Sequence, residues 1–278
     1  MKDKVAIVTG ANTGIGKETA RGLAKRGYSV VIACRDVSKG EAAKQDIVAI
    51  DPGADVHVIA LDLASRTSIE GFVAEAERML PRLDVLVNNA GLWKTARETG
   101  ELGLESTFAV NHLGTMRLTL GLLPLLEKSA PARVVVLSSA LHYRGKMAWD
   151  DLQFERQSFS GPAAYNQSKL ANVLFTKALA RRVKDRGVTV NAVHPGVVAT
   201  ELARDYPKLL VKLFHLFLLT PAQGAECSLF VATDPSLKGV TGEYFEKSRS
   251  KKAAKIALDE SEQERLWTLS EALLARTV

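Results

Sequence analysis

The chain has 278 residues, of which 46% are hydrophobic and 24% charged, so it can bury a sizeable core as a single α/β domain spanning 1–278. Its net charge is +6, but the basic residues are scattered among acidic ones, which excludes the basic stripe of a nucleic-acid-binding protein and favours a small phosphate-bearing partner. Cys34 and Cys227 lie far apart in apolar surroundings, which argues against a disulfide framework or a metal site.

The first four residues lead directly into a strand pattern, without the apolar region of a signal peptide or membrane anchor. We therefore expect a cytoplasmic protein with no transmembrane segment. Peripheral contact with a membrane and assembly into a homo-oligomer stay open at this point.

A glycine-rich turn follows the first predicted strand, residues 5–8, and precedes a predicted helix over 17–26. Its glycines, Gly10, Gly14 and Gly16, leave the backbone open to close approach, and the helix start directs free N–H groups and positive dipole at one point. This arrangement suits a pyrophosphate and predicts a dinucleotide-binding turn, although its spacing differs from the common G-x-G-x-x-G.

The end of the second predicted strand, residues 29–34, is where such folds meet the adenosine ribose. NAD-binding proteins usually place a carboxylate there, whereas this chain has the uncharged Cys34 followed by Arg35, whose planar donors suit a 2′-phosphate. We therefore predict NADP(H) in preference to NAD(H). Asp36 is the counter-evidence, since it could simply pair with Arg35 at the surface.

The alternation of strands and helices continues, with helices expected over 38–50, 67–80 and 104–126 and strands over 56–61, 83–87 and 134–137. Asn88-Asn89-Ala90-Gly91 follows the fourth strand and can bring backbone close to a ligand or form an ordinary turn. Asn111 lies among apolar residues, so its amide must find buried partners, either backbone groups or a water.

Two hydroxyl residues, Ser138 and Ser139, follow the fifth strand at the edge where ligands bind parallel sheets. Tyr165 and Lys169 then lie four residues apart in a predicted helix, on one face. A cation beside a phenol favours the phenolate and lowers its pKa, so this pair is a candidate acid/base.

The last third of the chain predicts a strand over 189–193, a turn at Pro195-Gly196, a helix over 221–232, a strand over 239–245 and a helix over 262–274. The apolar stretch 209–219 is too short to span a bilayer. It could cover a substrate, lie on a membrane surface, contact a partner or form a buried helix.

Together these residues resemble the short-chain dehydrogenase/reductase family over nearly the whole chain. The resemblance rests on motifs in the family's order: Thr9-Gly10-x-x-x-Gly14-x-Gly16, Asp62-Leu63, Asn88-Asn89-Ala90-Gly91, Asn111, Ser139, Tyr165-x-x-x-Lys169 and Pro195-Gly196. Ala33-Cys34-Arg35 and His194-Pro195-Gly196-Val197-Val198-x-Thr200 are similar to the retinol dehydrogenase branch. Membrane-bound members of that branch carry an N-terminal anchor that this sequence lacks.

The resemblance implies a Rossmann-type, doubly wound parallel sheet of seven strands in the order 3-2-1-4-5-6-7. It also implies hydride transfer between a nicotinamide and a carbonyl carbon, with Tyr165 as acid/base and Ser139 orienting the carbonyl oxygen. Lys169 would lower the Tyr165 pKa and hold the nicotinamide ribose, and Asn111 would position a water. Residues 200–220 would form a lid that selects apolar carbonyl or alcohol substrates.

By the same resemblance, the cofactor would contact residues spread over six segments, and no metal is implied. These residues are Gly10, Asn12, Gly14, Ile15, Gly16, Arg35, Asp62, Leu63, Asn89, Ala90, Gly91, Tyr165, Lys169, Pro195, Val198 and Thr200.

Two rival interpretations use the same scaffold. A Rossmann domain does not by itself entail catalysis, so the chain could be a nucleotide-sensing module without turnover. It could also be a light-dependent pigment reductase. The presence of Ser139, Tyr165 and Lys169 together favours a dehydrogenase or reductase over the sensing module.

Overall fold

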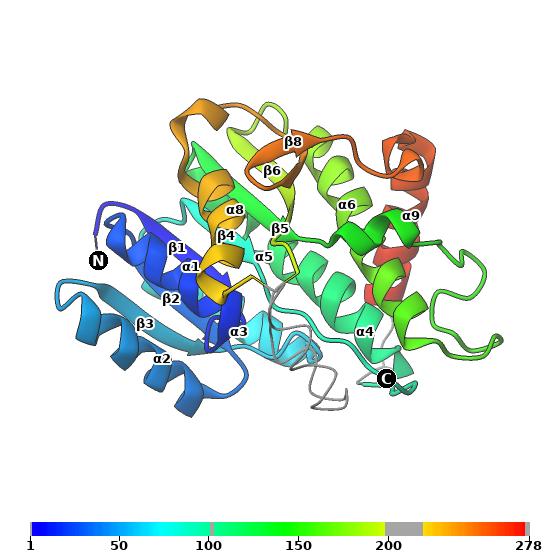
Figure 1. The fold of residues 1–278 in the computed structure, drawn as a ribbon, viewed down its shortest axis with the longest axis horizontal. Helices are drawn as coiled ribbons and strands as arrows, with labels where there is room; N and C mark the ends of the chain where they lie inside the picture. Colours follow the sequence, from blue (N-terminus) through cyan, green and yellow to red (C-terminus); the bar gives the residue numbers. More distant parts are fainter. Residues whose placement is uncertain (1, 101–102, 198–218, 276–278) are drawn as a thin grey trace.

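The computed structural model describes residues 2–100, 103–197 and 219–275, within which eight strands form one sheet in the order β3-β2-β1-β4-β5-β6-β7-β8 (Figure 1). The strands are β1 (Val5–Thr9), β2 (Ser29–Cys34), β3 (Asp55–Ala60), β4 (Val85–Asn88), β5 (Ala132–Leu137), β6 (Val188–His194), β7 (Tyr244–Glu246) and β8 (Arg249–Lys251). Strands β1 to β7 are parallel, and β8 pairs antiparallel with β7. The predicted seven-strand order is confirmed, and β8 is an addition at one edge.

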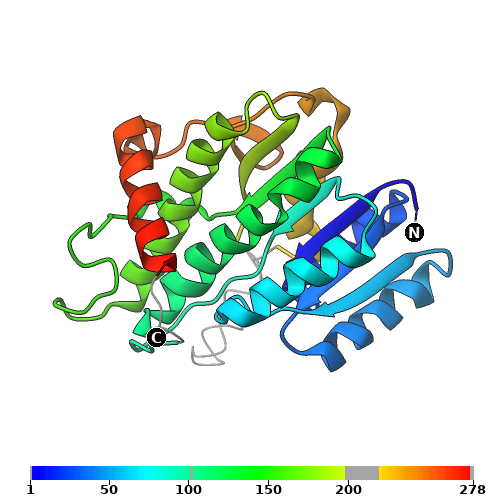
Figure 2. The ribbon, with the colours of Figure 1, turned by 180° about the vertical axis from the view of Figure 1, so that it is seen from behind.

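Helices cover both faces of the sheet (Figures 1 and 2). One face packs against α1 (Gly14–Lys25), α2 (Val37–Ile50) and α8 (Pro221–Thr233). The other packs against α3 (Arg66–Met79), α5 (Thr115–Lys128) and α6 (Gly161–Arg182), and α9 (Glu260–Leu274) packs against α6. Because both faces are covered, β1, β2 and β4 are buried along their whole length and appear in the sequence as continuous apolar runs.

Short polar residues fix where several helices begin. The side chains of Asp36, Ser65 and Ser160 accept backbone N–H bonds at the starts of α2, α3 and α6. Thr220 and Gln223 form a reciprocal capping box at the start of α8. Each such cap is worth about 1 kcal/mol, and the predicted starts of α2, α3 and α8 agree with the structure to within one residue.

Two predicted elements differ from the structure. The expected helix over 104–126 consists of α4 (Ser106–Phe108), a π-helical turn η2 (Ala109–Gly114) and α5. The expected strand over 239–245 is confined to β7, because Gly239 and Gly242 adopt positive φ angles of 77° and 76°, outside the extended region.

The described residues contain no helix long and apolar enough to cross a membrane. Most of the expected lid, 200–220, lies outside the described residues, so the alternatives for 209–219 stay predictions. Leu219 and Thr220 are described: the Leu219 N–H donates to the Val197 carbonyl at 2.9 Å, and Thr220 caps α8.

Candidate active site

The carboxyl ends of β1, β4, β5 and β6 bring four predicted loops to one edge of the sheet. The loops after β1 and β4 are joined by side chains. The Thr9 hydroxyl accepts the N–H groups of Asn89 and Ala90, each at 2.9 Å, and the Asn89 amide donates to the Thr9 carbonyl at 2.7 Å. The glycine turn and the Asn89 loop therefore form one rigid unit.

The glycines of the turn are needed for close approach. Gly10 and Gly14 have φ angles of +63° and +57°. A Cβ atom on Gly16 would lie 2.4 Å from the Asn89 amide nitrogen and 2.5 Å from the Gly10 carbonyl oxygen. No side chain caps the start of α1 at Thr13, so the first N–H groups of this helix stay open for an anion. The turn thus fits the pyrophosphate of a dinucleotide.

The end of β2 separates Arg35 from its acidic neighbour. Asp36 accepts the Lys39 N–H at 3.0 Å as the cap of α2, and its carboxylate lies 3.7 Å from the Lys39 ammonium. Arg35 is exposed and forms no hydrogen bond or ion pair with the described residues. The Cys34 thiol is buried and donates to the Asp36 carbonyl at 3.2 Å. The guanidinium is therefore available beside the turn.

Asp62 and Leu63 follow β3 and are held by local contacts. The Asp62 N–H donates to the Ser68 hydroxyl at 2.9 Å, and its carboxylate accepts the Ala64 N–H at 2.9 Å. Leu63 packs against η2, where a Cβ on Gly114 would lie 2.2 Å from the Leu63 carbonyl oxygen. Two further predicted cofactor residues, Asn12 and Ile15, are partly exposed on the glycine turn.

Tyr165 and Lys169 lie one turn apart on α6, as predicted. The buried Lys169 ammonium donates to the Leu137 carbonyl at 3.2 Å and lies 5.5 Å from the centre of the Tyr165 ring. The ring of Trp93 stacks on that of Tyr165, with 4.6 Å between centroids and 23° between planes. A Cβ on Gly91 would be 3.3 Å from the ammonium, so the β4 loop closes over the pair.

Burial has the largest influence on the pKa values of this pair in the protein alone. Burial raises the pKa of Tyr165 to about 12, and interaction with the Ser139 hydroxyl offsets part of that rise. Burial lowers the pKa of Lys169 to about 8. In the protein alone, burial is the largest influence on the pKa of Tyr165, and the phenol is protonated at neutral pH.

The two serines after β5 have different surroundings. The Ser138 hydroxyl is buried and donates to the Lys169 carbonyl at 2.7 Å, which ties β5 to α6. Ser139 is partly exposed, faces Tyr165 and accepts the Leu141 N–H at 3.2 Å. Ser139 is thus the serine whose hydroxyl is directed toward the phenol.

Asn111 lies in the π-helical turn η2 and is fully buried. Its amide group accepts the Leu92 N–H at 2.8 Å and donates to the Leu92 carbonyl at 2.9 Å and to the Ser168 hydroxyl at 3.0 Å. Of the two alternatives left by the sequence, these bonds match the first: Asn111 satisfies backbone groups, and it holds the loop that carries Trp93 against α6.

The family model described as "short chain dehydrogenase" matches residues 4–208. The chain belongs to the short-chain dehydrogenase/reductase family. Human retinol dehydrogenase 13 is 44% identical over 98% of this chain and 84% of its own, and mouse retinol dehydrogenase 12 is 46% identical over 98% and 86%. These relatives place the chain in the retinol dehydrogenase branch, and the family uses a nicotinamide dinucleotide, NAD(P)(H).

Solved structures agree with this assignment. A protein from Mycobacterium paratuberculosis described as uncharacterized has a TM-score of 0.79 and 33% identity, covering 98% of this chain and 93% of its own. A short chain dehydrogenase from Salmonella enterica serovar Typhi has a TM-score of 0.72 and 28% identity, covering 88% and 95%.

The nicotinamide end of this dehydrogenase site is described only in part. Pro195 and Gly196 follow β6, and Gly196 has a φ angle of +88°. A Cβ there would lie 2.4 Å from a Leu219 methyl carbon, so this turn packs against the residues that precede α8. Val198 and Thr200 lie outside the described residues.

Sequence reasoning did not predict the stacking of Trp93 on Tyr165. Gly161, at the start of α6, is the signal that could have indicated it. A Cβ on Gly161 would lie 2.3 Å from the Lys94 carbonyl oxygen and 3.1 Å from the Trp93 indole nitrogen, so only glycine lets the β4 loop reach this helix.

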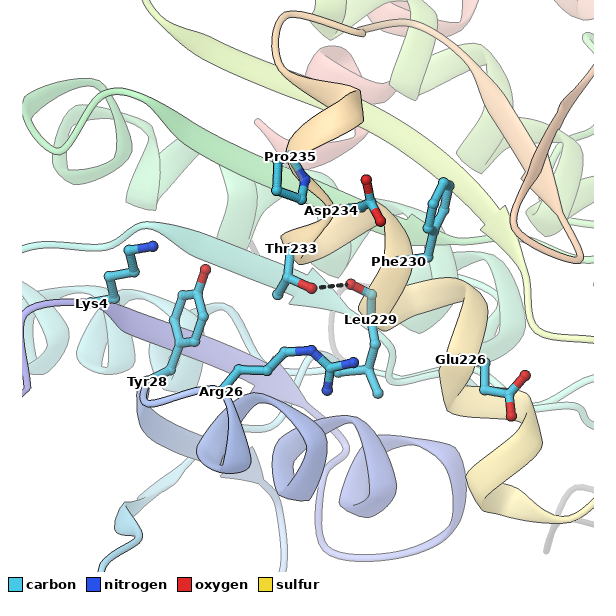
Figure 3. Close-up of a pocket in the computed structure, with 9 residues that line it drawn as sticks. All are labelled: Lys4, Arg26, Tyr28, Glu226, Leu229, Phe230, Thr233, Asp234 and Pro235. Atoms are coloured by element: carbon cyan, nitrogen blue, oxygen red, sulfur yellow. Dashed lines mark hydrogen bonds between the residues drawn. The ribbon is translucent and has the colours of Figure 1, made fainter.

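A separate surface hollow of about 480 Å³ lies at the amino ends of β1 and β2, the opposite edge of the sheet (Figure 3). Lys4, Arg26, Glu226 and Asp234 give it mixed charge, and the Lys4 ammonium lies 5.7 Å from the centre of the Tyr28 ring. No residue of the dehydrogenase site lines it. We assign it no part in the reaction.

Proposed function

We propose that the protein is an NADP(H)-dependent oxidoreductase that interconverts a hydrophobic alcohol and its aldehyde or ketone. The observation that carries the proposal is the convergence of Ser139, Tyr165 and Lys169 beside an anion-binding glycine turn, at one edge of the sheet. The sensing module requires none of these three side chains, and a hydroxyl directed at the partly exposed phenol of Tyr165 has no evident use in it.

In the reducing direction, the Tyr165 hydroxyl donates its proton to the carbonyl oxygen as the carbonyl carbon receives hydride. In the oxidising direction, the phenolate takes the alcohol proton. Bound NADP(H) supplies or accepts the hydride. Ser139 donates a hydrogen bond to the same oxygen and fixes its orientation, as a preorganised donor does for a developing oxyanion.

The pKa of Tyr165 suits proton donation better than proton removal. With a pKa near 12, the phenol carries its proton at neutral pH, and a pKa closer to the working pH would make it a stronger acid. Alcohol oxidation needs the phenolate, so we propose that it depends on added positive charge beside the ring. Lys169 at 5.5 Å and an oxidised nicotinamide both supply such charge.

Cofactor preference follows from Arg35 in this proposal. The guanidinium is exposed next to the glycine turn, and its acidic neighbour Asp36 is used to cap α2 and to contact Lys39. A guanidinium without a partner among the described residues favours a 2′-phosphate. A carboxylate at this position would instead favour the ribose hydroxyls of NAD.

We propose an apolar substrate because an indole ring, that of Trp93, lies on the catalytic phenol and because the named relatives are retinol dehydrogenases. Residues 200–220 are the proposed lid. The cytoplasm stays the proposed compartment, and both cysteines are free thiols.

The direct test is a panel of aldehydes and ketones of increasing chain length with NADPH, followed by the loss of absorbance of the reduced nicotinamide. We expect turnover, and an increase of kcat/KM with chain length, since each buried methylene contributes about 0.8 kcal/mol. Tight NADPH binding without turnover of any carbonyl would support the sensing module instead. Turnover with a flat series would retain the enzyme but exclude an apolar pocket.

A further inference from the structure

We propose that His142 is a positioning residue for Ser139, and that the C-terminal segment 249–257 fixes the imidazole tautomer that donates to this serine. The inference rests on the role of Ser139 in the proposed function. The match to the family model ends at residue 208, so the segment 249–257 lies beyond it, whereas Ser139 and His142 lie within it.

The hydrogen bonds of His142 define one tautomer. Ser139 begins the short 3-10 helix η3 (Ala140–Arg144), and His142 Nδ1 lies 2.7 Å from the Ser139 carbonyl oxygen. His142 Nε2 lies 3.2 Å from the backbone nitrogen of Ala254. The backbone N–H of Ala254 can only donate, so His142 Nε2 must accept. Nδ1 must therefore carry the proton and donate to the Ser139 carbonyl. One neutral imidazole satisfies both bonds.

The surrounding rings keep this imidazole in place. His142 is fully buried, with ring centroids 4.0 Å from Tyr143 and 4.5 Å from Tyr244 on β7. The Tyr143 hydroxyl donates to the Lys252 carbonyl at 2.8 Å, a second bond between η3 and the C-terminal segment. The segment after β8 thus contacts η3 at two points, and only the His142 bond continues to Ser139.

Holding the Ser139 carbonyl also orients its hydroxyl, since both belong to one residue at the junction of β5 and η3. A displacement of about 1 Å of a group that orients the substrate can reduce the rate about 100-fold. His142 does not contact Tyr165, so it acts through the serine and is not itself an acid/base for the substrate.

The charges facing His142 favour the neutral form overall. Burial lowers its pKa, His194 on β6 lowers it further, and Glu246 on β7 and the Ser139 carbonyl act in the opposite direction. Protonation would place an N–H on Nε2, opposite the Ala254 N–H, and break that bond. We therefore expect the link from the C-terminal segment to Ser139 to be lost in acid.

Two isosteric variants separate the two bonds of the imidazole. In His142→Asn, the amide nitrogen takes about the place of Nδ1 and can still donate to Ser139. In His142→Gln, the side-chain oxygen takes about the place of Nε2 and can accept from Ala254. We expect kcat to fall on the order of 10- to 100-fold in the Gln variant and by no more than about threefold in the Asn variant, with unchanged cofactor affinity.

A purely structural histidine would give a different result, namely equal losses of kcat in both variants or no loss in either, and that result would overturn the proposal. Tyr143→Phe is the matched control. It removes only the bond to Lys252, so its kcat should stay within about twofold of the unmodified protein.

Ser139→Ala keeps this inference distinct from the proposed function. If Ser139→Ala retains full activity, the proposed role of the serine fails, and the positioning role fails with it. If Ser139→Ala is inactive but His142→Gln is not, only the inference on His142 fails. With both roles correct, adding His142→Gln to Ser139→Ala causes little further loss, since the group being positioned is already absent.

A measurement on the unmodified protein covers the case in which the variants do not fold. The ¹⁵N resonances of His142 should show a neutral ring protonated on Nδ1, and the Ala254 amide should be protected from hydrogen exchange. A ring protonated on Nε2, or an unprotected Ala254 amide, would exclude the proposed link.

Discussion

The two halves of the active site are held together in different ways. The cofactor half, formed by the turns after β1, β2 and β4, depends on backbone conformation and short polar bonds such as that from Asn89 to Thr9. The substrate half, around Ser139 and Tyr165, depends on side chains that reach it from distant elements, including Asn111 in η2 and Ala254 after β8. The first half is specified by residue types at fixed spacings, and the second by packing.

This difference separates binding from chemistry. The dinucleotide turn needs only N–H groups and space, which three glycines and a helix start provide. The reacting groups need exact orientation and altered pKa values, which require burial by many partners. Changes in the first half should therefore alter cofactor affinity, and changes in the second should alter turnover.

Tyr165→Phe should give the largest effect and is confined to the substrate half. It removes the proton donor and keeps the ring that stacks on Trp93. We expect kcat to fall about 1000-fold, within the range that general acid catalysis contributes, with NADPH affinity nearly unchanged as measured by fluorescence titration. An active variant would refute Tyr165 as the acid, and a large loss of NADPH affinity would show that the two halves are not separable.

Lys169 lies where the halves meet, and its burial predicts a pH effect on stability. Its pKa is about 8 in the folded protein and about 10.4 in an unfolded chain, so the folded state binds fewer protons between these values. The stability contributed by the neutral amine is fully present above the unfolded pKa and is lost as pH falls toward 8. The difference amounts to about 3 kcal/mol.

The measurement is urea unfolding of the cofactor-free protein and of Lys169→Met from pH 7 to 10.5. The lysine protein should gain about 3 kcal/mol relative to the methionine variant over this range. Comparing the two proteins cancels the opposing effect of Tyr165, whose pKa is raised. A constant difference between them would mean that the ammonium is solvated in the folded state.

Arg35→Ala should weaken the binding of NADP and leave the binding of NAD and the chemistry at Tyr165 unchanged. Loss of a charged, bidentate phosphate contact costs about 1.5–3 kcal/mol, whereas NAD lacks the 2′-phosphate that Arg35 would contact. Titration of both dinucleotides into both proteins measures this. Equal weakening of NADP and NAD, or a preference of the unmodified protein for NAD, would contradict the assignment of NADP.

Gly16→Ala should give a smaller loss, shared by NADP and NAD. The new Cβ would lie within 2.5 Å of the Asn89 amide and the Gly10 carbonyl, and relieving that overlap costs about 1–3 kcal/mol. Gly71→Ala in α3 is the control, because nothing lies within 4 Å of its added Cβ. We expect lower cofactor affinity for the first variant and unchanged affinity for the second; equal affinities would show that the turn relaxes.

The same contrast explains what the sequence could predict. The alternation of strands and helices and the positions of Tyr165, Lys169 and the glycine turn follow from local spacing and periodicity, and the strand order follows from the resemblance to the family. The bonds of Asn111 in its π-helical turn and the bond from Ala254 to His142 do not, because each depends on residues far away in the chain. The short strand β8 pairs with the adjacent β7 and was not predicted. The rise that burial causes in the pKa of Tyr165 in the cofactor-free protein was not predicted either, since sequence spacing reveals a nearby lysine but not the depth of burial.

The stacking of Trp93 on Tyr165 gives the protein an optical reporter of its own. Of the three tryptophans, Trp149 and Trp267 lie against Arg265 and Arg182, whereas Trp93 stacks on the ring of Tyr165. A substrate that reaches the Tyr165 hydroxyl must pass this indole or displace it. The intrinsic fluorescence should therefore change in proportion to site occupancy, which would allow ligands to be ranked without turnover and without a label.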